Sequence, residues 1–414
     1  MTATDGNLSY WLATAPEWPA GDSALPDQAD VVVLGAGIMG SATAYWLARL
    51  GMRALVLERN AAPGAGATGR NAGMHVPTAA DGYLDTVALV GRSAARAIFE
   101  VTEVGRRLLE EVLTREAIDA HFRARGLWTL VTDAEAARAQ ENTAALRADG
   151  FAAEWQDRAT AAAAWGSPLG QGYAGAVFNA TGATFHSARY TRGVAAAAQR
   201  LGATFVCRAP VTSVAAQGDG WAVTTARGTV LARQVVVAVN AWAGDLFPEL
   251  APLLAPVRGH ILVTEPLAGV EVGPFSANAG YEYGQQLPDG RMLFGGMRLT
   301  RADRDVGYAP AAGQNAPPVE PAVVAALEAA LPQLVPAAAG ARTERHWSGV
   351  MDFTADHQPL IGAWPGRPGL WLLVGFSGHG MPYSQVLPYA VAAQLAGAEG
   401  PAVPAAFAPG RLLR

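Results

Sequence analysis

The sequence predicts an α/β fold built around a doubly wound, Rossmann-like parallel sheet. Two observations carry this prediction. An uncharged run at residues 31–48 is interrupted by the glycines of GAGIMG at 35–40. A helix-like stretch, SATAYWLARLG at 41–51, then leads into a second strand-like stretch, RALVLE at 53–58. A strand, a tight turn, a helix and a strand within about thirty residues form one βαβ unit of such a sheet.

The first strand is predicted at DVVVL, residues 30–34. A short run of β-branched residues is typical of a buried parallel strand. A membrane span is the competing interpretation of an uncharged run, and the glycines that break this one disfavour it. Gly51 marks the expected end of the helix, because glycine readily adopts the left-handed conformation found there.

The glycines that follow the first strand indicate a dinucleotide site. Gly35 permits the tight turn, Gly37 lets the backbone approach a pyrophosphate, and Gly40 lets the helix pack closely on the strand. The N–H groups of the helix N-terminus then point at the phosphates. Glu58 ends the second strand, where a carboxylate can accept hydrogen bonds from ribose hydroxyls and disfavours a 2′-phosphate. The fingerprint does not distinguish NAD from FAD.

Composition limits the remaining choices. A chain of 414 residues suggests two or three domains, and 51% hydrophobic with 16% charged residues is typical of a globular protein. A net charge of −5 and the lack of a basic run argue against nucleic acid as a partner. The beginning of the chain does not resemble a signal peptide, so we expect a cytoplasmic protein without a membrane span.

Two residue counts have chemical consequences. Cys207 is the single cysteine, so the sequence offers neither a disulfide framework nor a CxxC metal site, and we predict no metal. Apolar residues alternate around Cys207, which predicts a buried structural thiol in a strand. All 30 residues counted as lysine or arginine are arginine, so no site in this sequence can use a lysine.

Two further glycine-rich segments favour FAD over NAD. In the loop at 62–77, Thr68 can hydrogen-bond a phosphate, Arg70 can offset its charge, and the small Ala72 and Gly73 let the chain pass against a flavin ring. At 369–397 a buried strand enters a glycine turn and then a helix, whose N-terminus can stabilise the anionic end of a reduced flavin. A surface loop and an ordinary strand-to-helix connection are the alternative interpretations.

The segments GAGIMG with Glu58, GATGRNAG and GFSGHG, in this order and spacing, resemble the D-amino-acid oxidase (DAO) superfamily of FAD enzymes. SYWLATAP near the start is similar to the glycine, sarcosine and glutamylputrescine oxidase branch. QVVVAVNAWAG at 234–244 resembles the family's strand beside the adenine half, and WSGVMDFTADHQPLIG at 347–362 its segment over the flavin. The resemblance covers nearly the whole chain, but is loose over 98–180 and 246–345.

The resemblance implies an FAD-binding domain interleaved with an antiparallel-sheet substrate domain. The expected division is an N-terminal extension at 1–27, an FAD-binding domain at 28–97, 181–245 and 346–414, and a substrate domain at 98–180 and 246–345. Residues 84–118 and 134–165 are predicted to be helical, and 260–267 and 290–300 to be strands.

The predicted cofactor contacts come from all the segments named above. They are Gly35, Gly37, Ile38, Met39, Gly40, Glu58, Arg59, Ala67, Thr68, Arg70, Asn71, Ala72, Gly73, Met74, Val211, Asn240, Trp242, Gly349, Gly375, Ser377, Gly378, His379, Gly380 and Met381.

The implied reaction is oxidation of the C–N bond of an amine or amino acid, by hydride transfer to flavin and hydrolysis of the imine. We expect non-covalent FAD, because the family's flavin-tethering cysteine aligns with Gly349. A lysine that promotes reaction with dioxygen in the family aligns with Met292, so the electron acceptor stays open; we favour an oxidase over a dehydrogenase.

An FAD hydroxylase that uses NAD(P)H is the other alternative. Its DG-type motif is matched only by Asp289-Gly290, which a hairpin turn explains. The sequence leaves the oligomeric state open.

Five residues are candidates for catalysis or substrate binding. His75 follows the flavin-threading loop, where it could lower the pKa of the substrate amine or assist dioxygen reduction; a buried histidine bonded to the backbone is the alternative. Asp352 could hold a cationic amine or face solvent, and Met351 aligns with an arginine that binds the substrate carboxylate. Arg298 is the best remaining carboxylate clamp, with a surface ion pair as the alternative. We expect only one of Tyr281 and Tyr283 to face the flavin.

Overall fold

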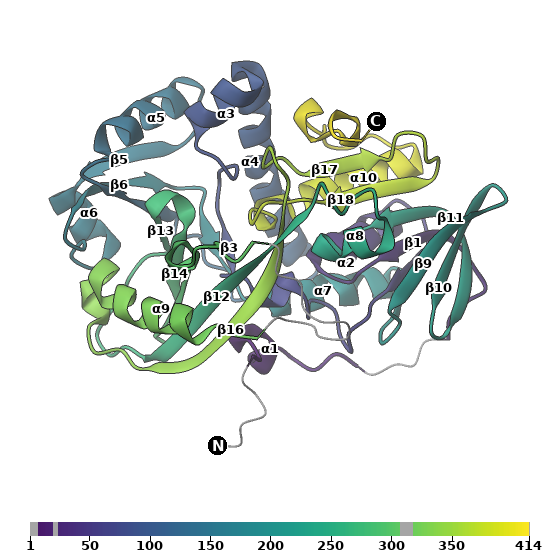
Figure 1. The fold of residues 1–414 in the computed structure, drawn as a ribbon, viewed down its shortest axis with the longest axis horizontal. Coiled ribbons are helices and arrows are strands. Elements are labelled where there is room, and N and C mark those ends of the chain that lie inside the picture. Colours follow the sequence, from purple (N-terminus) through teal and green to yellow (C-terminus); the bar gives the residue numbers. More distant parts are fainter. Residues whose placement is uncertain (1–6, 20–23, 307–317, 414) are drawn as a thin grey trace.

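A computed structural model describes residues 7–19, 24–306 and 318–413. Two large sheets lie side by side, and the long strands that cross the middle of Figure 1 belong to the second of them. The main path of the first sheet consists, in spatial order, of β17 (Leu360–Ala363), β18 (Leu370–Val374), β11 (Gly228–Val237), β1 (Gln28–Leu34), β2 (Ala54–Leu57) and β8 (Thr204–Val206). All neighbours on this path are parallel except β17 and β18. The predicted βαβ unit is therefore confirmed.

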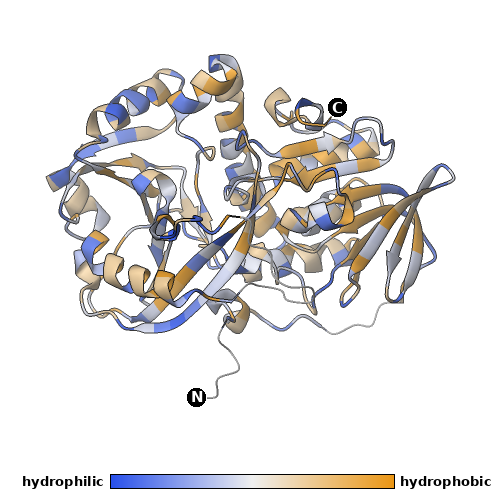
Figure 2. Ribbon diagram, in the orientation of Figure 1, coloured by the Kyte–Doolittle hydropathy of each residue, from blue (hydrophilic) through white to orange (hydrophobic). Residues whose placement is uncertain are grey.

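Long helices cover one face of the first sheet. They are α2 (Ile38–Arg49), α4 (Arg92–Arg115), α7 (Ser187–Arg200) and α10 (Val386–Ala396). Val31, Val33 and Val236 point into this layer, while Val32 and Val235 point to the opposite face. The opposite face is covered by an antiparallel extension of the sheet, β9 (Val211–Gln217) and β10 (Gly220–Thr225), and by the short helix α8 (Ala243–Leu246). Apolar residues gather along the strands beneath these layers (Figure 2).

The second sheet is mostly antiparallel. Its strands, in spatial order, are β16 (Thr343–Phe353), β12 (Ala255–Pro266), β15 (Arg291–Gly295), β14 (Glu282–Gln286), β13 (Phe275–Ala277), β4 (Leu127–Thr132), β6 (Tyr173–Asn179) and β5 (Ala153–Asp157). Only β13 and β4 pair in parallel. The predicted domain boundary at residue 346 falls inside β16, which pairs with β12 along most of its length. The Asp289-Gly290 turn joins β14 to β15 as a hairpin.

The helices beside the second sheet differ from the prediction in one place. They are α3 (Tyr83–Val90), α5 (Ala136–Ala148), α6 (Arg158–Trp165) and α9 (Pro321–Leu334). The helical prediction for 134–165 holds for α5 and α6 but is wrong between them, because Gly150, at φ +93°, follows α5 and the chain then pairs with β6 as the edge strand β5. The strand expected over 290–300 ends at Gly295, since Gly296 and Met297 both have positive φ.

The remaining elements are short. They are α1 (Tyr10–Thr14), β3 (Met74–His75), β7 (Ala183–Thr184), and the 3-10 helices η1 (Ala67–Arg70), η2 (Asn240–Trp242), η3 (Asn278–Gly280), η4 (Arg298–Thr300), η5 (Pro336–Ala338), η6 (Met381–Tyr383), η7 (Ala405–Phe407) and η8 (Pro409–Arg411). Cys207 follows β8 as a partly buried free thiol, and burial raises its pKa to about 11. Within the described ranges, no helix is both long and apolar enough to cross a membrane.

Candidate active site

A cavity of about 1000 Å³ runs between the two sheets. It extends from the glycine turn after β1, past η1, to the turn after β18, and continues beneath the second sheet. Most predicted cofactor residues line it; those that do not are Gly40, Gly73 and Gly375. Of the five catalytic candidates, Asp352, Arg298, Tyr281 and Tyr283 line the cavity and His75 does not.

The first glycine turn has no room for side chains. Gly35 has φ +92°, and a Cβ there would lie 2.8 Å from the carbonyl oxygen of Ala238. A Cβ on Gly40 would lie 1.9 Å from the carbonyl oxygen of Gly35, so the start of α2 touches the turn. The N–H of Ile38 donates to the hydroxyl of Thr68 at 3.1 Å. The first turn and the second glycine-rich loop are thereby joined at the cavity wall.

Glu58 fixes the first turn from the end of β2. Its carboxylate accepts hydrogen bonds from the N–H of Ala36 at 2.7 Å and from the N–H and side-chain amide of Asn60 at 2.8 and 2.6 Å. The residue is buried but lines the cavity. The acid that was predicted to bind a ribose therefore also holds the backbone of the turn in place.

An aromatic and cationic wall closes this end of the cavity. The guanidinium carbon of Arg59 lies 4.0 Å from the ring centroid of Trp242, and burial lowers the pKa of Arg59. Val211 lines the same region. Asn240, at φ +57°, donates from its side chain to the carbonyl of Val350 at 3.0 Å, which connects the two sheets here.

The carbonyl groups of residues 70–73 are held by side chains from distant segments. Trp347 donates to the carbonyl of Arg70 at 2.9 Å, Trp11 to that of Asn71 at 2.6 Å, and Gln285 to that of Gly73 at 3.1 Å. Sequence reasoning did not identify these three donors. Trp11 and Trp347 do lie in the SYWLATAP and WSGVMD segments, which were singled out as family-like. Nothing in the sequence singled out Gln285.

Arg70 is also anchored to the chain. Its Nη1 donates to the carbonyls of Asn7 at 2.7 Å and Ser348 at 3.1 Å. Burial lowers its pKa to about 10, which still leaves it cationic at neutral pH. A Cβ on Gly349 would lie 3.0 Å from the Cβ of Arg70, so the glycine lets β16 pack closely against Arg70.

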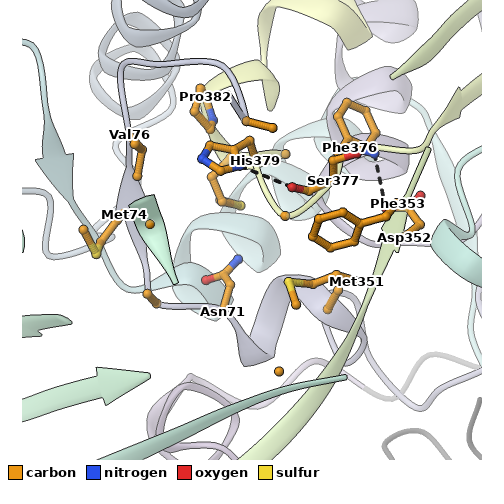
Figure 3. A pocket seen from close by; sticks show the side chains of 18 of the residues that line it. Asn71, Met74, Val76, Met351, Asp352, Phe353, Phe376, Ser377, His379 and Pro382 are labelled. Atoms are coloured by element: carbon orange, nitrogen blue, oxygen red, sulfur yellow. Dashed lines mark hydrogen bonds between the residues drawn. The ribbon is translucent and has the colours of Figure 1, made fainter. Parts of the chain in front are cut away.

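The turn after β18 is organised by Asp352 (Figure 3). One carboxylate oxygen accepts from the N–H of Gly375 at 2.5 Å and the other from the N–H of Phe376 at 3.2 Å. The backbone carbonyl of Asp352 accepts from the N–H of Ser377 at 2.8 Å. Burial raises the pKa of Asp352, while the hydrogen bonds from the turn oppose this shift. The alternative in which this acid faces solvent is wrong, because it is 4% exposed.

His379 lies in the same turn and lines the cavity. Its backbone N–H donates to the carbonyl of Phe376 at 2.8 Å, and its ring Nδ1 lies 3.3 Å from the carbonyl oxygen of Ser377. Burial lowers the pKa of the His379 ring, so the ring is neutral at neutral pH. Gly378 has φ +80°, which lets the turn bend towards Met351 without a side chain.

His75 lies behind the cavity wall. It is fully buried, and neither ring nitrogen has a hydrogen-bond partner within the described residues. Burial, reinforced by the positive charge of Arg106, lowers the pKa of His75 to about 3. The backbone of Thr102 lies close to the ring and opposes this shift, as a hydrogen-bond partner would. The alternative of a buried histidine at the backbone therefore fits better than a place beside a flavin, which would need contact with the cavity.

Both tyrosines of GYEYGQ line the cavity. We expected only one of them to face the flavin, on the assumption that both lie on one strand. Tyr281 instead has helical backbone angles, φ −72° and ψ −31°, and its ring still reaches the cavity beside Tyr283. Tyr283 lies on β14, and Tyr281 directly precedes that strand. Burial raises the pKa of Tyr283 to about 12, so its hydroxyl remains protonated at neutral pH.

Arg298 enters the cavity between two aromatic rings. Its guanidinium carbon lies 4.6 Å from the ring centroid of Tyr281 and 5.0 Å from that of Phe353. Within the described residues the guanidinium forms no salt bridge, although many other arginines are paired with acids. Glu282 lies near enough for the charge of Arg298 to oppose the rise that burial causes in the pKa of that carboxyl, but the two form no salt bridge. A half-buried cation that is not engaged in a salt bridge, at the wall of a cavity, is suited to bind a carboxylate.

Comparisons with known proteins agree with this geometry. The model of the family described as FAD dependent oxidoreductase (DAO) matches residues 30–392. The chain is 27% identical to gamma-glutamylputrescine oxidoreductase of Escherichia coli (strain K12), covering 91% of this chain and 86% of that protein. It is 28% identical to glycine oxidase of Pseudomonas aeruginosa, covering 92% and 99%.

Solved structures share the fold. Glycine oxidase from Geobacillus kaustophilus superposes with a TM-score of 0.78 at 24% identity, covering 92% of this chain and 98% of that one. L-Amino acid deaminase from Proteus myxofaciens superposes with a TM-score of 0.80 at 18% identity, covering 97% of each chain. Both combine parallel and antiparallel sheets as this chain does.

Proposed function

Since this chain belongs to the DAO family of FAD-dependent oxidoreductases, we propose that it oxidises the C–N bond of an amino acid to an imine, which water then hydrolyses. Arg298 lines the cavity and forms no salt bridge among the residues that the structure describes, and this supports an amino acid over a simple amine as the substrate. The names of two relatives, glycine oxidase and gamma-glutamylputrescine oxidoreductase, support the broader class of amine and amino-acid substrates.

The residues of the cavity fit FAD. The turn after β1 would approach the pyrophosphate, since Gly37 leaves the backbone uncovered and a Cβ there would lie 3.3 Å from the Thr68 hydroxyl. Arg59 and Trp242 would hold the adenine end, and the turn containing Ser377 and Gly378 the flavin end. We assign the first sheet and its helices to FAD binding and the second sheet to substrate binding.

FAD, when bound, accepts the hydride from the carbon that carries the amine. The protein orients that carbon through the substrate carboxylate. Arg298 can bind a carboxylate with two parallel hydrogen bonds, and the rings of Tyr281 and Phe353 keep the guanidinium plane in place. In this chain Met351 occupies the position that aligns with the family's carboxylate-binding arginine. Arg298 reaches the same region of the cavity from the segment after β15.

The cavity also favours a neutral substrate amine, which is the form that can release hydride. Free amines have a pKa of about 10, and burial together with a nearby cation lowers it. Arg298 supplies the cation. The nearby Asp352 carboxylate is bound to backbone N–H groups, and the His379 ring is neutral. We therefore propose that desolvation and Arg298 lower the pKa of the amine, so that the amine loses its proton to solvent water without a dedicated base in the protein.

We propose that FAD is held non-covalently and that dioxygen reoxidises it. Cys207 does not line the cavity, and Gly349 occupies the position aligned with the family's tethering cysteine. A different electron acceptor is the second candidate, and one observation favours it. The sequence contains no lysine, and Met292, which aligns with the oxygen-activating lysine, is fully buried outside the cavity.

One anaerobic experiment tests the proposal. The purified protein is loaded with FAD, and amino acids, amines and NADPH are added separately while the flavin absorbance is recorded. Bleaching by an amino acid supports the proposal, and the rate of recovery in air distinguishes an oxidase from a dehydrogenase. Bleaching by NADPH alone would indicate the hydroxylase instead. Yellow colour that stays on the protein after acid precipitation would contradict non-covalent binding.

A further inference from the structure

A row of neighbouring residues crosses the second sheet above the cavity. Thr129 on β4 pairs with Val177 on β6 and with Ser276 on β13. Ser276 in turn pairs with Tyr283 on β14. All four residues line the cavity, because directly paired residues of adjacent strands point to the same face of a sheet. The roof of the cavity therefore runs without interruption from Tyr283 to the far strand β6.

The row also continues towards the flavin side. Tyr283 pairs with Gly295, and Gly295 pairs with Ile261, which lines the cavity. A Cβ on Gly295 would lie 2.5 Å from the ring of Tyr283, so the missing side chain leaves the space that this ring occupies. Tyr283 thus stands between the part of the cavity that faces Arg298 and an arm that extends under β13, β4 and β6.

The walls of this arm are mainly apolar. Helix α5 contributes Ala139 and Leu146, and the strands contribute Leu127, Ala153 and Val177. The hydroxyls of Thr129 and Ser276 lie 3.3 Å apart and hydrogen-bond to each other. They therefore satisfy one another when no polar ligand group is present.

The charged residues at the end of the arm already have partners. Glu135 accepts hydrogen bonds from the N–H and hydroxyl of Thr132 at 3.1 and 2.7 Å. Arg138 forms salt bridges with Asp85 at 2.9 Å and with Glu141 at 3.0 Å.

On the opposite rim, Asp81 lies 3.0 Å from the Nδ1 of His357. A charged group on a ligand would have to displace one of these pairs. Arg298 differs from these charged residues, because it forms no salt bridge among the described residues.

We propose that the arm binds the side chain of the substrate, and that this side chain is extended, uncharged and largely apolar. The inference rests on the proposed function, in which Arg298 holds the α-carboxylate. Small amino acids would leave the arm empty, and acidic or basic side chains would lose hydration without gaining a partner. Each methylene group buried in the arm should improve binding about fourfold.

The test uses the FAD-loaded protein and a series of racemic straight-chain amino acids, from alanine to norleucine, with glycine, glutamate and lysine added. The apparent second-order rate of anaerobic flavin bleaching is measured for each. A variant, Ala139→Phe, places a ring in the arm, and Ala137→Phe places the same ring on the exposed side of the same helix. The flavin spectrum and melting temperature of both variants report on folding.

We expect the rate to rise along the series to norleucine and to fall for glutamate and lysine. Ala139→Phe should abolish the advantage of norleucine over alanine, while Ala137→Phe should preserve it. Two results would contradict side-chain binding in the arm but leave the proposed function intact. One is flavin bleaching by glycine as fast as by norleucine, and the other is an equal loss of bleaching rate for all substrates in Ala139→Phe. Absence of bleaching by every amino acid would overturn both.

Discussion

The carboxylate of Asp352 lies 2.5 Å from the backbone nitrogen of Gly375, and through this contact a strand of the second sheet shapes a turn of the first. The same carboxylate reaches Phe376, so both of its oxygens are engaged. A buried acid beside the cavity would ordinarily suggest catalysis. Here its hydrogen bonds assign it to holding the turn after β18, which lines the cavity and which we propose to face the flavin.

Replacing Asp352 by asparagine should weaken both the fold and FAD binding. The amide group would present one acceptor oxygen and an NH₂ group, so one backbone N–H of the turn would lose its partner. The expected loss is about 1–3 kcal/mol in the free energy of unfolding. Urea unfolding and FAD titration measure the two effects. Asp133→Asn, an exposed acid, is the control, and equal values for both variants would refute the role given to Asp352.

Gly40→Ala should prevent FAD binding. The added methyl group would lie 1.9 Å from the carbonyl oxygen of Gly35, which is backbone and cannot move without opening the turn. Gly410→Ala is a suitable control, because a Cβ there would make only ordinary contact, at 3.5 Å, with Pro365. Fluorescence of bound FAD reports the result. Normal FAD affinity in Gly40→Ala would show that the turn does not contact the cofactor.

Buried neutral histidines should make the protein sensitive to acid. The pKa of His75 and of His186 is lowered to about 3, and that of His260 to about 4, against about 6.5 in an unfolded chain. Between these values the unfolded state binds more protons than the folded state, so stability is complete above about pH 6.5 and falls as the pH decreases.

His75→Asn should remove one of the protons that the unfolded state binds in excess of the folded state. Below pH 6, the slope of unfolding free energy against pH should decrease by up to about 1.4 kcal/mol per pH unit relative to the unmodified protein. Urea unfolding at several pH values measures this slope. An unchanged slope would mean that His75 can take up a proton in the folded protein.

The sequence allowed the βαβ unit and the tight packing at Gly40 to be predicted, because both depend on residues close together in the chain. The roles of Asp352, Trp347 and Gln285 were not predictable in the same way. Each acts on backbone that is distant in sequence, and the partner is set only when the two sheets come together. Strand β5 was missed for a similar reason, since an alanine-containing edge strand is stabilised by its neighbour and not by its own residues.

Arg298 was identified as a clamp by its residue type alone, and the structure adds the two aromatic rings and the lack of an acidic partner within the described residues. The segment GYEYGQ at 280–285 shows a second limit of predicting structure from sequence patterns. Spacing alone does not place Tyr281, which precedes β14 with helical backbone angles. The sheet register places Tyr283 on the face that roofs the cavity, and Tyr281 joins it there from outside the strand.

The most direct test of the account compares an amino acid with the amine that remains when its carboxylate is removed. Anaerobic flavin bleaching is measured for both compounds in the unmodified protein, in Arg298→Met and in the exposed control Arg233→Met. We predict that the unmodified protein and Arg233→Met react much faster with the amino acid. Arg298→Met should lose at least about 30-fold with the amino acid, the equivalent of about 2 kcal/mol, and clearly less with the amine, for which Arg298 only lowers the pKa of the amino group. Equal losses for both compounds, or no loss, would contradict the assignment of Arg298 as the carboxylate clamp.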